Sequence, residues 1–90
     1  MSKIPTGEPI RVSAHADGYR ASRGFTEAEV GAAIRTSRWL PARNDRLEAT
    51  KNYLFNAEWN GKRYVTKRVL PVFIEEANEI VVVTVYTFFF

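Results

Sequence analysis

The dipeptide Asn60-Gly61 constrains the fold of this 90-residue chain more than any other feature. It separates two stretches, 53–59 and 62–68, in which apolar and polar side chains alternate. Asn-Gly is the preferred pair of a two-residue type I′ turn, which joins antiparallel strands in one fixed register. In that register Glu58 faces Arg63, and this pair of opposite charges supports it. The sequence therefore predicts a β-hairpin over residues 53–68.

The same alternation assigns side chains to the two faces of the hairpin. The face directed toward the helices is expected to carry the large apolar side chains Tyr53, Phe55, Trp59 and Tyr64. The turn register places Lys67 opposite Leu54, on the other, open face. On the last strand an apolar row, Val81, Val83 and Val85, should face the helices. Thr84 and Tyr86 then share the open face with Lys67.

Residues 80–90 predict one long strand, because they are rich in β-branched and aromatic residues and contain no turn signal. We expect this strand to be paired on both sides or buried on both faces. Pro71 predicts a bulge or a sheet edge in the strand before it. The three final residues, Phe88, Phe89 and Phe90, should pack in the core or form an interface in a homodimer or with another protein.

Two helices are expected before the hairpin. Thr26 and Glu29 form a capping box, so a helix should begin there and end before Pro41. An earlier helix is expected from about Ala14 to Arg23, with Gly24 as its left-handed cap. Residues 1–9 read as a loose N-terminal arm, residues 10–14 as a short strand or helix lead-in, and residues 42–50 as a loop. The prediction is a single α+β domain over 10–90, with two N-terminal helices on a three- to four-stranded antiparallel sheet.

Composition excludes several classes of protein and suggests a partner. The chain contains no cysteine and one histidine, so neither a transition-metal site of ordinary type nor another cofactor site is expected. The first residues contain no apolar run, so no signal peptide is expected, and no apolar run in the chain is long enough to cross a membrane; a cytoplasmic protein is expected. Residues 35–68 carry nine cations against three anions, which suggests a polyanion such as RNA. The alternative is an ordinary solvated basic face.

His15 is the one side chain with an ordinary pKa suited to acid–base chemistry near neutral pH. It could take the proton from a ribose 2′-OH or protonate a leaving 5′-oxygen. The alternative is a histidine that caps a short helix or lies on its surface. Cations on the open face could neutralise a phosphodiester, and Tyr86 could stack on a base. Taken one at a time, these side chains are more typical of a solvated β face, and it is their position together on one face that suggests a functional site.

Two segments resemble a family of small bacterial proteins of uncharacterised function, similar to BrnT and more distantly to the RelE and ParE toxins. The first is 15–30, in which seven residues separate His15 from Arg23, and the second comprises 67–76 and 79–86. The resemblance implies a RelE-like ribonuclease fold, a cognate antitoxin and a site made of His15, Arg23, Lys67, Thr84 and Tyr86. The flanking cations Arg20, Arg63, Arg68 and Lys62 would contact RNA. Many members have arginine where this chain has Tyr19.

The resulting expectation is a metal-independent toxin ribonuclease that cleaves RNA by 2′-OH attack. Two alternatives remain: a non-catalytic module that binds RNA or protein, and a toxin that inhibits another enzyme by binding it. Catalysis requires His15 and Lys67 to converge on one cleft, with Thr84 and Tyr86 at its floor. Their placement on opposite sides of the sheet would favour the binding module.

Overall fold

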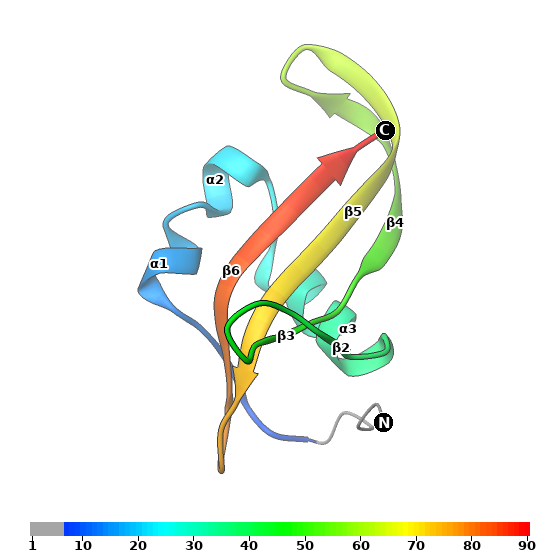
Figure 1. Ribbon diagram of the computed structural model, residues 1–90. Helices are drawn as coiled ribbons and strands as arrows, with labels where there is room; N and C mark the ends of the chain where they lie inside the picture. The colour runs from blue at the N-terminus through cyan, green and yellow to red at the C-terminus, as the bar shows by residue number, and fades with distance from the viewer. Residues whose placement is uncertain (1–6) are drawn as a thin grey trace.

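A computed structural model of the chain describes residues 7–90 (Figure 1). The sheet contains six strands, and three short helices lie beside it. In chain order the elements are β1 (Ile10–Val12), α1 (Ala14–Asp17), α2 (Arg20–Arg23), α3 (Glu27–Thr36), β2 (Leu40–Pro41), β3 (Leu47–Glu48), β4 (Lys51–Trp59), β5 (Lys62–Glu75) and β6 (Ile80–Phe89). The predicted architecture, two helices on a three- to four-stranded RelE-like sheet, is therefore wrong.

The additional strands lie at the two margins of the β4–β5–β6 meander. The strand order is β1-β6-β5-β3-β2, and β4 also pairs with β5. β1 runs parallel to β6, with Ile10 opposite Ile80, so the sheet is mixed rather than antiparallel. β2 and β3 are two residues each; β3 lies inside the expected 42–50 loop, and β2 directly precedes that loop. Strands this short have too few residues for an alternating pattern to indicate them.

The expected N-terminal arm, residues 1–9, lies mostly outside the described residues. Its last residue belongs to the sheet region, because the carbonyl of Pro9 accepts the N–H of Ile80 at 2.8 Å. This bond belongs to the parallel pairing of Ile10 with Ile80. The carbonyl of the last residue of the predicted arm therefore takes part in the hydrogen bonding of the sheet.

The predicted helix caps are present, whereas the predicted helix lengths differ from those in the structure. Thr26 and Glu29 make both hydrogen bonds of the capping box at the start of α3, as predicted. Gly24 ends α2 with φ of 72°, the predicted left-handed cap. The single helix predicted up to this glycine is instead two helices, interrupted at Gly18 and Tyr19. Glycine stabilises a helix interior poorly, which explains why the break falls there.

The hairpin turn is confirmed, and a bulge changes the pairing beyond it. Asn60 and Gly61 have φ of 51° and 83°, and Glu58 faces Arg63. The register shifts between Leu54 and Ala57, where Asn56 has φ of 43°. An extra residue in one strand moves every later pair by one position. As a result, Lys67 lies opposite Tyr53 instead of Leu54.

A second bulge, in β6, determines which valines enter the core. Thr84 faces Val72, but Val82 faces Phe73, so Val83 is the extra residue. Ile80, Val82 and Val85 are completely buried and belong to the core that also contains residues of α3. The predicted row of Val81, Val83 and Val85 is thus only partly correct.

The last strand is paired on both sides only at its start. β5 accompanies it along its length, whereas β1 pairs with Ile80–Val82 alone. At its end, Phe89 packs against the rings of Phe55, Trp59 and Tyr64. Phe88 and Phe90 are about half exposed. The sheet face that carries them is not covered by the helices.

Candidate functional site

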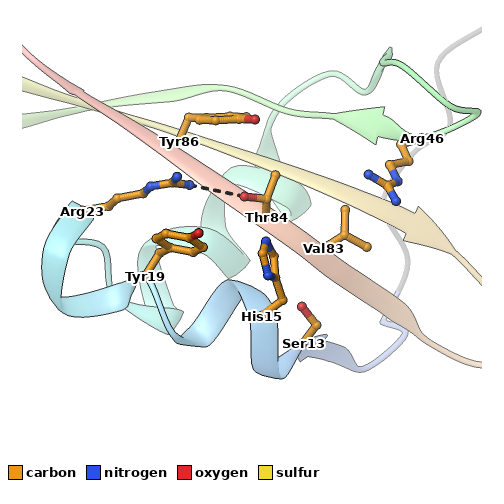
Figure 2. Close-up of a pocket in the computed structure, with 8 residues that line it drawn as sticks. All are labelled: Ser13, His15, Tyr19, Arg23, Arg46, Val83, Thr84 and Tyr86. Atoms are coloured by element: carbon orange, nitrogen blue, oxygen red, sulfur yellow. Dashed lines mark hydrogen bonds between the residues drawn. The ribbon is translucent and has the colours of Figure 1, made fainter.

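An open pocket of about 460 Å³ lies where α1 and α2 meet the unpaired edge of β6 (Figure 2). Its walls come from the first helices, from the β2–β3 turn and from the middle of β6. The lining residues are Ser13, His15, Tyr19, Arg23, Arg46, Val83, Thr84 and Tyr86. Four of the five residues predicted to be catalytic are in this set.

Ser13 fixes α1 against β6. Its N–H donates to the carbonyl of Val82 at 3.0 Å, a bond that belongs to the parallel pairing of Val12 with Val82. Its hydroxyl accepts the N–H of Ala16 at 3.1 Å, and this cap starts α1. One residue therefore ends the strand and begins the helix, so that His15 is held beside the strand edge.

Arg23 lines the pocket from the side of α2 (Figure 2). Its Nη1 donates to the carbonyl of Val85 at 2.8 Å and to the Thr84 hydroxyl at 3.3 Å. The guanidinium carbon lies 4.0 Å from the centre of the Tyr19 ring and 5.2 Å from that of Tyr86. Stacking between two aromatic faces restrains the guanidinium plane and leaves other N–H groups for a ligand.

His15 is exposed at the mouth of the pocket. Its ring contacts the edge of Tyr19 at a centroid distance of 5.3 Å. Figure 2 shows the imidazole pointing toward Thr84. Tyr19 thus contacts both the imidazole of His15 and the guanidinium of Arg23.

Sequence reasoning missed four pocket residues, Ser13, Tyr19, Arg46 and Val83, of which Arg46 alone is charged. Arg46 follows Asn44 and Asp45, which both adopt positive φ, in the turn between β2 and β3. In Figure 2 its guanidinium lies on the opposite side of Thr84 from Arg23. Only a tertiary contact brings this turn to β6, so nothing in the local sequence marks Arg46 as a site residue.

A second hollow of about 360 Å³ continues from the pocket over the open face of the sheet. The two hollows share Arg46, Thr84 and Tyr86. The remaining lining residues of the second hollow are Ala42, Arg43, Asn44, Glu48 and Val72. Tyr86, which is 46% exposed, forms the boundary between them.

Lys67 does not take part in this site, and its predicted position on the open face is wrong. It is 5% exposed, and its Nζ lies 2.7 Å from Oε1 of Glu29 in α3. It therefore points toward the helices, whereas Thr84 and Tyr86 line hollows on the other face. The bulge at Asn56 is consistent with Lys67 lying on the helix-facing side of the sheet, because it places Lys67 opposite Tyr53. The hydroxyl of Tyr53 donates to the carbonyl of Glu29 in α3.

The four cations predicted to contact RNA also lie outside the pocket lining. Arg20 pairs with Asp17, and this hydrogen bond raises the pKa of Arg20. Arg63 donates to the backbone and side-chain oxygens of Asn56. The other two, Lys62 and Arg68, lie over the rings of Tyr64 and Phe90.

The described residues contain no group of three or more histidine, cysteine or acidic side chains placed to hold a metal ion. Within the same residues, no helix is both long enough and apolar enough to cross a membrane. The chain matches no protein-family model, no curated protein and no solved structure.

The chemistry of the pocket suits an anion. Its lining includes two guanidiniums, one imidazole, two phenols and two aliphatic hydroxyls, and no carboxylate. Guanidinium groups bind phosphate oxygens in a bidentate manner, and a tyrosine ring can stack on a base. The lining therefore combines cationic groups of the kind that bind phosphate with one group capable of proton transfer.

Proposed function

We propose that this protein binds single-stranded RNA and holds one phosphodiester between Arg23 and Arg46. The observation that carries the proposal is the stack of Tyr19, Arg23 and Tyr86 around a pocket without a carboxylate. Arg23 is already oriented by Val85 and Thr84, so little side-chain entropy is lost when it meets a phosphate.

Single-stranded RNA fits this site better than a duplex. Tyr86 is half exposed beside the cations, and an aromatic face can receive a base only where that base is unstacked from its neighbours. A duplex would present phosphates alone, and the rings would then contribute little. Sequence-tolerant binding of an unpaired strand is the expected mode.

Binding is tested by fluorescence anisotropy with a labelled unstructured RNA over a range of salt concentrations. Arg46→Ala should lower the affinity and reduce the slope of log affinity against log salt by about 1. Arg38→Ala is the matched control, because it removes an exposed arginine outside both hollows. Equal losses in the two variants would mean that only overall charge matters, and would refute a specific phosphate site.

RNA cleavage is the second candidate, and the position of His15 in the same pocket favours it. His15 would accept the proton of the 2′-OH as the 2′-oxygen bonds to phosphorus. The P–O5′ bond then breaks, the 5′-oxygen takes a proton from water, and a 2′,3′-cyclic phosphate remains. Arg23 and Arg46 would stabilise the added charge, the role that sequence reasoning gave to Lys67.

Incubation of RNA with the purified protein and EDTA tests cleavage, with analysis of the fragment ends. Fragments ending in 2′,3′-cyclic phosphate are expected from the native protein and not from His15→Gln, which should still bind RNA. Fragments that persist with His15→Gln would exclude the histidine. RNA that is bound and left intact by the native protein would establish binding alone.

The biological setting that we propose is the bacterial cytoplasm, with an antitoxin as protein partner. It rests on the resemblance of the segments around His15 and Thr84 to toxin families. Growth arrest on induction, relieved by His15→Gln, would support a toxin that acts through RNA cleavage. Arrest that His15→Gln does not relieve would instead favour inhibition of another enzyme by direct binding.

A further inference from the structure

An exposed aromatic row begins at the pocket and follows one face of β6 to the residue after its end. Tyr86, Phe88 and Phe90 follow one another at intervals of two residues and are 46%, 47% and 54% exposed. Side chains at this interval point to the same face of a strand, roughly 6.8 Å apart. Large apolar side chains rarely gather in the open on a protein without a binding partner.

We propose that this aromatic row receives successive bases of the RNA strand whose phosphate lies in the pocket. The inference rests on the proposed function and extends it to the number of nucleotides held. Tyr86 belongs to the row and also lines both hollows, so the row continues directly from the candidate phosphate site. A strand leaving the pocket along β6 would meet Phe88 next and Phe90 after it.

The spacing and charge of this face suit an unpaired strand. Adjacent rings are separated by about twice the roughly 3.4 Å rise of a stacked strand. Bases already separated from one another can match that interval, whereas stacked ones cannot. The face also carries a cation that could reach the RNA backbone, Arg68. Its guanidinium carbon lies 5.1 Å from the centre of the Phe90 ring, and its Nε donates to Oδ1 of Asn52.

The charge also argues against a second copy of this chain as the occupant. The pocket at one end of the row presents Arg23 and Arg46, and Arg68 lies at the other end. Two copies meeting through this face would bring these like charges together, which disfavours association. A polyanion is attracted by the same arrangement.

The test compares a uridine dinucleotide with a uridine hexanucleotide, both without secondary structure. The hexanucleotide should bind at least about tenfold more tightly, because each stacked base adds affinity. The double variant Phe88→Ser, Phe90→Ser should lose this gain and keep the dinucleotide affinity of the native protein. Leu54→Ser is the control, since it removes a side chain that is 84% exposed and lies outside the row.

Each outcome bears on the proposal. A length-dependent gain that survives in the double variant would overturn the role of the row while leaving the phosphate site intact. A native dimer that becomes a monomer in the double variant, measured by sedimentation, would assign the row to self-association and overturn the inference. Failure of both oligonucleotides to bind the native protein would overturn the proposed function and this inference together.

Discussion

Replacement of Lys67 by alanine should act on stability and not on the pocket. The Nζ of Lys67 lies 2.7 Å from Glu29 Oε1, and its side chain is 6% exposed. Removing one partner of a buried ion pair costs about 3–5 kcal/mol. The carboxylate of Glu29 is 22% exposed and still accepts the N–H of Thr26, so we expect the lower end, about 3 kcal/mol. For a domain of this size that corresponds to a fall in Tm of about 12–24 °C.

Thermal and urea unfolding followed by circular dichroism measure this loss. The comparison is the double variant Lys67→Met, Glu29→Gln, in which neither side chain is charged and glutamine can still close the capping box. Replacing both charges should cost far less than breaking the pair, and RNA affinity should not change. The reasoning fails if Lys67→Ala loses less than about 1 kcal/mol or if the double variant is as unstable as the sum of its single changes.

Three further predictions concern the framework of the site. Gly24→Ala should destabilise the fold by about 2–4 kcal/mol in urea unfolding, because φ is 72° and the new methyl carbon would lie 2.5 Å from the Trp59 ring. Thr26→Ala removes the hydroxyl that caps α3 and should cost about 1 kcal/mol in the same assay. Burial, with a smaller contribution from Glu29, raises the pKa of Tyr53 above 10.0. The folded state thus favours the neutral phenol, so this contribution to stability is complete below pH 10.0 and lost as pH rises through the folded-state pKa. Tyr53→Phe should flatten that part of the pH profile, and an unchanged profile would contradict this role.

The parts of the fold that local chemistry specifies were predictable. The Asn60-Gly61 turn, the capping box at Thr26 and the left-handed glycine at the end of α2 each depend on a few adjacent residues. Pairings between distant segments were not. β1 has three residues, and its partner in β6 lies about seventy positions away in the sequence, so no periodic pattern indicates this pairing.

The site residues were predicted correctly where the prediction did not require the pairing register between β4 and β5. His15 was selected for its acid–base chemistry, Arg23 from the resemblance, and Thr84 and Tyr86 from alternation along the last strand, and all four line the pocket. Lys67 came from the resemblance and from counting pairs across the hairpin, and the bulge at Asn56 invalidates the count. A bulge exchanges inward and outward side chains without changing the hydrophobic pattern that precedes it.

The side-chain bonds of Arg23 have a consequence for aggregation. Beyond Val82, no strand within residues 7–90 pairs with the edge of β6 that faces α2. Arg23 takes the carbonyl of Val85 on this edge, and the hydroxyl of Thr87 donates to the carbonyl of Arg23. An open strand edge is a template on which another chain can add a strand. Arg23 therefore covers an edge on which strands could aggregate, as well as lining a pocket. A ligand that draws its guanidinium away would leave the Val85 carbonyl open to pairing with a second polypeptide.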